Sequence, residues 1–274
     1  MEGCGPTVGV FDSGVGGLTV ARAILRAIPG VRLCYFADTA HVPYGPRPLT
    51  QICDFAVQII EFLFAQGVDA VVLGCNMSSA AGAYAAATER IARPIFDIIQ
   101  PGCRAACTAS TIGKIGVIAT QGTVNSGVYG HTLRTMGINA IFEQACPAFV
   151  PLVENGQLDG AAVETAVMDY LTPLCAEGVD TLIFGCSHYP YLREVIQRFM
   201  GDGVRLIDPA EFVAREVAEH FHTSTDDATD PSRHRFYCSG DPHSLRREGE
   251  RFLGLPLLNV EQVNVPTERV KGEE

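Results

Sequence analysis

Short apolar runs alternate with longer amphipathic stretches along most of this chain. Apolar positions at Val20, Ile24 and Ile28 have the spacing of a helix, whereas runs such as 8–11 are apolar throughout. Strands without a polar face are typical of a parallel sheet that helices cover on both sides. The pattern therefore predicts an α/β fold, with strands at 8–11, 33–36, 95–96, 115–119, near 141, at 206–207 and at 235–238, besides the two described next.

One stretch occurs twice. Residues 65–76 read AQGVDAVVLGCN and residues 176–187 read AEGVDTLIFGCS, and each predicts a helix end, a glycine turn, a buried strand and a cysteine. Cys75 and Cys186 are about 110 residues apart, roughly one small domain. Ligands of α/β sheets bind beyond the carboxyl ends of the strands. The repeat therefore predicts two similar halves whose cysteines face each other across a cleft.

The segments between the strands suggest where the halves join. Asp97–Pro101 and Asp208–Pro209 are interpreted as the two crossovers, which predicts a first domain of 1–99 plus 209–274 and a second of 100–208. The helices are expected at 50–66, from Ser78 or Ser79 to 90, up to 136 after a turn at 119–124, and at 159–177. Residues 222–234 are expected to form a surface loop or a disordered segment, and the last residues to be frayed.

Composition places the chain among globular proteins. Hydrophobic residues make up 47% and charged residues 19% of the 274 residues, which allows a core without disulfide staples. No apolar run reaches the roughly 18 to 20 residues that cross a bilayer, and the N-terminus shows no targeting signal. We therefore expect a cytoplasmic protein with no membrane partner.

Charge and cysteine usage narrow the class of partner. The net charge of -11 argues against nucleic acid, because phosphate backbones bind positive surfaces, while a protein partner stays possible. Ten cysteines are scattered without CxxC spacing or a secretory signal, which favours reduced thiols. No further metal ligands stand beside Cys75, and Cys103 and Cys107 are expected to pack on a helix face. His220 and His222 are explained by a helix end.

A glycine-rich turn, DSGVGG, follows the first strand at 12–17. Free N–H groups at the start of the next helix favour an anion such as a carboxylate, although the glycines could equally serve only a tight turn. Thr19 stands where a dinucleotide fingerprint needs its third glycine, and no Walker lysine follows. Nicotinamide and nucleoside triphosphate cofactors therefore lose support.

A second loop carries polar residues after the strand at 33–36. Pro43, Tyr44, Gly45 and Pro46 predict a rigid turn at the sheet edge. The simplest interpretation of Asp38, His41 and Tyr44 is a surface loop that bonds to itself.

The paired cysteines suggest acid/base chemistry. A thiol with a pKa of about 8.5 is only slightly ionised at neutral pH, so a neighbour must lower that pKa or take the proton. Asp12 is the candidate neighbour of Cys75, and His188 stands two residues after Cys186. One cysteine on each side of a carbon can remove a proton from one face and return one to the other. A single Cys–His nucleophile for acyl transfer would need only one cysteine. The repeated cysteine therefore distinguishes the acid/base mechanism from the acyl-transfer mechanism.

Five motifs then support a resemblance. FDSGVGGLTV, YFADTAHVPYG, GCN, PLVENG and GCSHYP occur in the order seen in glutamate racemases of the cofactor-independent aspartate/glutamate racemase superfamily. The resemblance implies two similar three-layer α/β domains with mainly parallel sheets, related by a pseudo-twofold axis, with the active site in the cleft between them. It also implies no pyridoxal phosphate and no metal.

The same resemblance assigns catalytic roles. Cys75 would act on the D-enantiomer and Cys186 on the L-enantiomer. Asp12 and His188 would assist, with Glu154 near the second cysteine.

Substrate-binding positions follow from the resemblance too, and they include Asp12 and His188. The others are Ser13, Pro43, Tyr44, Gly45, Asn76, Met77, Ser78 and Ser187. Met77 replaces the family's usual Thr and removes a hydroxyl, which costs roughly 1.5 to 3 kcal/mol where it bonds a charged group, unless Ser78 substitutes. Ser187 also replaces a Thr but keeps the hydroxyl.

The sequence thus predicts a homodimeric racemase that interconverts L- and D-glutamate and supplies D-glutamate for peptidoglycan. One alternative is a racemase for aspartate or another acidic amino acid. The other is a non-catalytic protein that binds amino acids or regulates gyrase.

Overall fold

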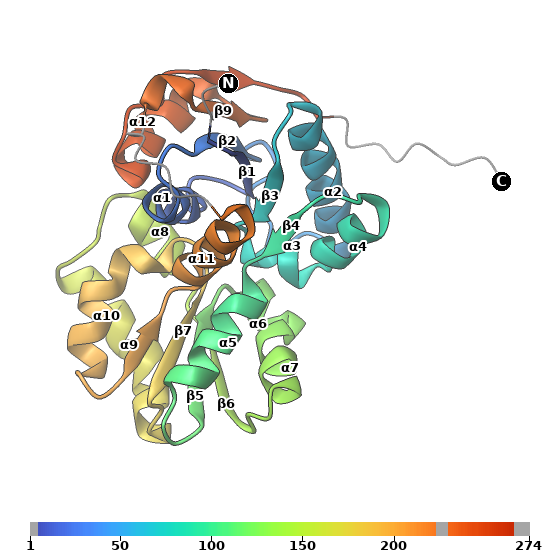
Figure 1. Ribbon diagram of the computed structural model, residues 1–274. Helices are drawn as coiled ribbons and strands as arrows, with labels where there is room; N and C mark the ends of the chain where they lie inside the picture. The colour runs from blue at the N-terminus through green and yellow to red at the C-terminus, as the bar shows by residue number, and fades with distance from the viewer. Residues whose placement is uncertain (1–4, 223–229, 266–274) are drawn as a thin grey trace.

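Two parallel sheets form the centre of the computed structural model, which describes residues 5–222 and 230–265 (Figure 1). The first sheet has the order β10-β9-β2-β1-β3-β4 and the second β6-β5-β7-β8, and every pair of neighbouring strands is parallel. The strands are β1 Thr7–Asp12, β2 Arg32–Ala37, β3 Ala70–Leu73, β4 Ile95–Asp97, β5 Lys114–Ala119, β6 Ala140–Ala145, β7 Thr181–Gly185, β8 Arg205–Ile207, β9 Arg235–Cys238 and β10 Val260–Gln262. The predicted α/β class is confirmed, and β10 is an addition to the predicted strands.

The two sheets repeat one arrangement. The order β2-β1-β3-β4 in the first sheet matches β6-β5-β7-β8 in the second. The repeated stretches place β3 and β7 at equivalent positions, each after a helix and a left-handed glycine, Gly67 and Gly178. The predicted duplication is therefore confirmed.

Helices cover the sheets and connect them. They are α1 Leu18–Ala27, α2 Leu49–Ala65, α3 Asn76–Ala80, α4 Ala83–Arg90, α5 Ile99–Ala109, α6 Gln121–Ser126, α7 Val128–Thr135, α8 Phe149–Glu154, α9 Ala161–Glu177, α10 Arg193–Met200, α11 Pro209–Phe221 and α12 Pro242–Leu253, with 3-10 turns η1 Tyr189–Leu192 and η2 Pro231–Arg233. Helices α5 and α11 pack against each other where the chain passes between the sheets (Figure 1).

Several helix boundaries differ from the prediction. The expected helix from Ser78 or Ser79 to Arg90 is two helices, because Gly82 adopts φ +81° after an earlier start at Asn76. Gly127, at φ +65°, likewise separates α6 from α7. Helices α5 and α6 also begin inside the segments expected to be a crossover and a turn.

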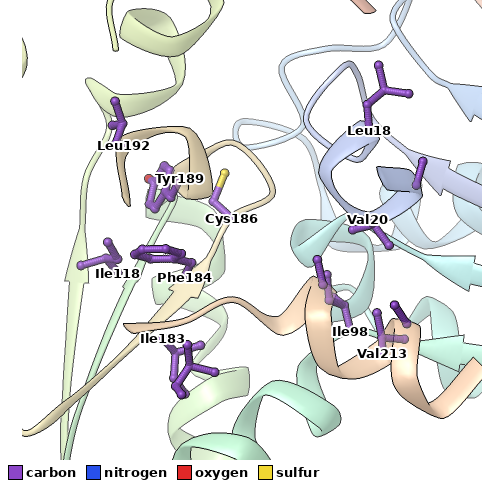
Figure 2. Close-up of a cluster of buried hydrophobic side chains, with 14 of the residues drawn as sticks. Leu18, Val20, Ile98, Ile118, Ile183, Phe184, Cys186, Tyr189, Leu192 and Val213 are labelled. Atoms are coloured by element: carbon purple, nitrogen blue, oxygen red, sulfur yellow. The ribbon is translucent and has the colours of Figure 1, made fainter. Parts of the chain in front are cut away.

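The core continues from one sheet into the other. Along β1, Val8 and Val10 face the cluster shared with the second sheet, whereas Phe11 faces α2, as expected of a strand buried on both sides. Figure 2 shows Leu18 of α1 and Phe184 of β7 in that shared cluster. This packing fixes the carboxyl ends of both sheets relative to each other.

Some predictions concern residues outside the described ranges. These are most of the 222–234 loop, the C-terminal residues 267–274 and Cys4. The nine described cysteines are all free thiols, and Cys103 lies on the buried face of α5, in agreement with the predicted packing on a helix face. Within the described ranges, no helix combines the length and the apolar character needed to span a membrane.

Candidate active site

The two repeated cysteines occupy equivalent positions at the carboxyl ends of their strands. Cys75 follows β3 after one glycine and precedes α3, and Cys186 directly follows β7. Both are buried, with exposed fractions of 4% and 7%. As predicted, each half of the molecule supplies one thiol at a strand end.

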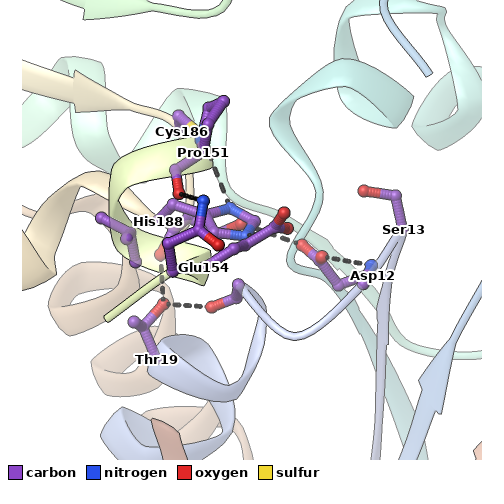
Figure 3. A network of polar contacts seen from close by, with 12 residues as sticks. Asp12, Ser13, Thr19, Pro151, Glu154, Cys186 and His188 are labelled. Atoms are coloured by element: carbon purple, nitrogen blue, oxygen red, sulfur yellow. Dashed lines mark hydrogen bonds and ion pairs between the residues drawn. The ribbon is translucent and has the colours of Figure 1, made fainter. Parts of the chain in front are cut away.

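The second cysteine is the start of a polar chain. The Sγ atom of Cys186 lies 3.9 Å from Nδ1 of His188, and Nε2 of His188 lies 3.2 Å from Oε1 of Glu154 (Figure 3). Burial alone would lower the pKa of His188, but the hydrogen bonds to Cys186 and Glu154 and the charges of Cys186 and Asp12 raise it to about 10. An imidazolium at this distance can stabilise negative charge on Cys186.

Cys75 has a different environment. Its Sγ atom donates to the Ser13 hydroxyl at 3.6 Å. Burial raises the pKa of Cys75, the negative charge of Asp12 raises it further, and Ser78 and Ser13 offset part of the rise, so that the pKa is about 11. Cys75 is therefore a protonated thiol at neutral pH.

Asp12 connects the surroundings of both cysteines. It is the last residue of β1 and fully buried, and its carboxylate accepts hydrogen bonds from the Gly14 N–H at 2.9 Å and from the Ser187 hydroxyl at 3.1 Å. Burial raises the pKa of Asp12, and the charge of His188 opposes that rise. The expected place of Asp12 beside Cys75 is found, since β1 and β3 are neighbours, but its reach to Ser187 was not foreseen.

The glycine-rich turn brings the two halves into contact. A Cβ on Gly16 would clash with Nδ1 of His188 and Oγ of Ser187. Thr19, just beyond the turn, donates to the Ser187 carbonyl at 3.1 Å (Figure 3). The Gly14 N–H that could have met an external anion already bonds Asp12. Gly16 thus serves close approach between the two halves rather than a tight turn alone.

The loop between β2 and α2 bonds to itself, as predicted. The Asp38 carboxylate accepts from Tyr44 at 2.6 Å and lies 2.7 Å from His41 Nδ1. Contrary to the prediction of a surface loop, Asp38 and Tyr44 are buried: Tyr44 packs in the core cluster that includes Phe55 of α2, and Ser239 after β9 donates to Asp38. Pro43 and Gly45 are exposed in this loop.

Tyr44 lies within electrostatic range of the first cysteine. Burial raises its pKa well above the usual value, and the charges of Asp38, Cys75 and Asp12 add to the rise. The phenol of Tyr44 therefore stays protonated.

Helix α3 carries three of the predicted binding residues, Asn76, Met77 and Ser78, and Ser78 is fully buried. Asn76 Oδ1 accepts from the Tyr129 hydroxyl at 2.5 Å, while Asn76 Nδ2 is buried without a partner. Met77 Sδ accepts from the Thr123 hydroxyl at 3.7 Å. Met77 also packs closely on α6, where a Cβ on Gly122 would lie 2.8 Å from its sulfur.

Tyr129 and Thr123 were missed by sequence reasoning. Thr123 lies in the polar turn noted at 119–124, but nothing local distinguishes Tyr129 from a core aromatic. Among the described residues, no group of three or more His, Cys, Asp or Glu side chains could hold a metal ion.

Known proteins resemble this chain over most of its length. The family model described as Asp/Glu/Hydantoin racemase matches residues 8–217. A glutamate racemase of Desulforudis audaxviator is 42% identical over 257 residues, which is 90% of this chain and 94% of the relative.

Solved structures agree. A glutamate racemase isoform of Bacillus anthracis has a TM-score of 0.88 at 37% identity, covering 97% of this chain and 100% of the other. A glutamate racemase of Thermus thermophilus, in complex with β-chloro-D-alanine, has a TM-score of 0.85 at 36% identity with the same coverage.

Proposed function

This chain belongs to the Asp/Glu/hydantoin racemase family, and on that premise we propose that it interconverts L- and D-glutamate with Cys75 and Cys186 as the two bases. The observation that carries the proposal is the pair of buried thiols at equivalent strand ends, each with its own polar partners. The relatives named above are glutamate racemases, which supports glutamate as the substrate.

The reaction is a proton exchange at the α-carbon. With L-glutamate bound, the Cys186 thiolate takes the α-proton, and the electron pair stays on the α-carbon as a carbanion. The Cys75 thiol then gives its proton to the opposite face, which yields D-glutamate, a Cys186 thiol and a Cys75 thiolate. The reverse reaction starts from that last protonation state, so atoms and charges balance in both directions.

The surroundings of the cysteines favour one of these protonation states. Burial raises the pKa of Cys75, which keeps it a thiol, while the raised pKa of His188 keeps an imidazolium beside Cys186. The resting enzyme is therefore prepared to accept L-glutamate. Asp12 opposes negative charge on Cys75 and stabilises positive charge on His188, so it supports the same state.

The substrate is held by the polar groups around the two thiols. We assign Ser13, Asn76 and Ser187, with Tyr44, Gly45 and the Pro43 turn, to its carboxylates and amino group, and Ser78 to the hydroxyl role left open by Met77. Ser13 contacts Cys75, and Asn76 and Ser187 directly follow the two cysteines, which supports this assignment. Because Met77 packs against α6, we expect it to shape the end of the site that receives the substrate side chain.

The test is proton NMR of the purified protein with each enantiomer of glutamate in deuterated buffer. Loss of the α-proton signal, with the other enantiomer appearing, is the expected result. No loss of the α-proton signal with glutamate, together with loss of that signal with aspartate, would show that the substrate is aspartate and would direct attention to Met77. Binding of glutamate without any exchange would instead leave a non-catalytic protein on a racemase fold.

We propose further that the protein is cytoplasmic and homodimeric, and that its D-glutamate enters peptidoglycan. Depletion of the protein should then stop growth of its host unless D-glutamate is added. Light scattering of the purified chain should give twice the monomer mass. Growth without added D-glutamate, or a monomeric mass, would contradict the respective statement.

A further inference from the structure

Asn76 has a buried amide nitrogen whose partner is missing. Asn76 directly follows Cys75 and is only 4% exposed, yet its Nδ2 atom has no hydrogen-bond partner. Leaving a buried donor unpaired destabilises the folded protein, so proteins rarely keep one without a use. This donor stands one residue from a proposed catalytic thiol.

Tyr129 determines which atom of the amide is left free. Its hydroxyl lies 2.5 Å from Asn76 Oδ1 in a buried contact. Burial, together with the negative charges of Cys103 and Asp97, raises the pKa of Tyr129 well above its usual value. The phenol therefore keeps its proton and can donate a hydrogen bond. If the amide were reversed, Nδ2 would meet the phenol oxygen and the O–H would lose its carbonyl acceptor. The arrangement with Oδ1 toward Tyr129 and Nδ2 free is therefore the stable one.

The position of Tyr129 makes this bond a link between the two halves. Tyr129 belongs to α7, which follows the second sheet's β5, whereas Asn76 begins α3 at the end of β3 in the first sheet. The ring of Tyr129 also lies against Gly185, since a Cβ on Gly185 would be 3.0 Å from Tyr129 Cε2. Gly185 directly precedes Cys186, so one tyrosine packs beside one thiol and bonds the neighbour of the other.

We infer that Tyr129 is a positioning residue, which holds the Asn76 amide so that Nδ2 donates to a carboxylate of the bound substrate. This inference rests on the proposed function for the identity of the substrate. Tyr129 acts through Asn76 and itself touches no reacting atom. Binding of the carboxylate in the ground state and in the transition state should benefit equally, because the carboxylate is negatively charged before and during the proton transfer and neither gains nor loses a proton.

The decisive variant is Tyr129→Phe, which keeps the ring on Gly185 and removes only the hydroxyl. We expect KM for glutamate to rise about tenfold, the value of one hydrogen bond to a charged group, with kcat within about twofold of the wild type. Asn76→Ala should show a similar rise in KM. In the double variant, Tyr129→Phe should add nothing, because its route of action is already absent.

Tyr237→Phe is a matched control. Tyr237 is also buried, and its hydroxyl donates to a side-chain amide oxygen, that of Gln66 at 3.2 Å. It lies on β9, which β2 and β1 separate from β3, so loss of its hydroxyl should leave KM and kcat unchanged.

Three results would overturn the inference: an unchanged KM in Tyr129→Phe, a fall in kcat alone, or a further rise in KM when Tyr129→Phe is added to Asn76→Ala. Wild-type protein without glutamate turnover would refute the proposed function instead. If Tyr129→Phe does not fold, NMR of the wild-type side-chain amides still decides. The chemical shifts of the Asn76 side-chain amide protons should change on addition of glutamate. Unchanged chemical shifts would show that Nδ2 does not bind the substrate, which would reject the inference.

Discussion

Replacing Glu154 by Gln tests the polar chain that leads to Cys186. The change keeps the size of the side chain but removes the negative charge 3.2 Å from Nε2 of His188. Less support for the imidazolium means less stabilisation of a Cys186 thiolate. Because the two enantiomers have equal free energies, kcat/KM must fall by the same factor from either side.

The size of the effect follows from the geometry and exposure. Two unit charges 3.2 Å apart attract by about 1.3 kcal/mol in water. The water value is appropriate because the Glu154 side chain is 48% exposed, and pairs of this kind contribute about 0.2 to 1 kcal/mol when measured. At the upper end, about 1 kcal/mol corresponds to a fivefold change in rate and to about 0.7 of a pH unit in the pKa of His188.

We therefore expect Glu154→Gln to lower kcat/KM about fivefold. The pKa of His188, raised to about 10 in the native protein, should fall, because the imidazolium loses a partner. Activity that depends on the imidazolium is present below this pKa and is lost as pH rises through it. The alkaline limb of the profile should thus move to lower pH by up to about 0.7 of a unit.

Circular dichroism of glutamate, followed from both enantiomers across the alkaline range, measures both quantities. Glu164→Gln is the control, since Glu164 is 60% exposed and pairs with Arg198 at 3.7 Å, so it removes the same charge without touching His188. If Glu154→Gln matched this control in rate and in its alkaline limb, the chain from Glu154 through His188 to Cys186 would have no catalytic part.

Three further outcomes are expected. Cys75→Ala and Cys186→Ala should each lower racemisation by at least about a hundredfold, and full turnover in either would exclude the two-base mechanism. Asp12→Asn should lower kcat from D-glutamate more than His188→Asn does, because an amide cannot take the proton that Cys75 must give up before it acts on D-glutamate, and the opposite order would overturn the pairing of Asp12 with Cys75. Asp180 should stabilise the fold in a pH-dependent way. Partial burial raises the pKa of Asp180, but hydrogen bonds lower it to about 2, and these come from Ser110, Thr111 and Ile112. Its contribution is therefore complete above about pH 4 and lost as pH falls toward 2. Urea unfolding should show Asp180→Asn less stable by about 1 kcal/mol at neutral pH, with the difference closing in that acid window; a constant difference would refute it.

Local sequence was a good guide to the strands and a poorer one to the breaks between helices. The apolar runs around Val8 and Val117 identified buried parallel strands because such strands need no polar face. Gly82 and Gly127 each lie between two consecutive helices. Their left-handed conformation depends on where the following helix must pack, so spacing alone did not show it.

The candidate site divides in the same way. Cys75 and Cys186 could be found because the same sequence pattern occurs twice in the chain. His188 could be found because it is two residues after Cys186. The reach of Asp12 to Ser187 and of Tyr129 to Asn76 could not be found. These partners are 175 and 53 residues apart in the chain, and only the packing of one half on the other brings them within bonding distance.

By itself, the sequence determined two parallel α/β halves, each with a cysteine at the end of an equivalent strand, since strand periodicity and repetition are properties of neighbouring residues. The tertiary structure alone decided the electrostatics. Burial raises the pKa of the Cys75 thiol to about 11, and the approach permitted by Gly16 sets His188 and Ser187 against the Asp12 turn. Burial and charge are sums over groups distant in the chain, and those sums exist only once the two halves are packed together.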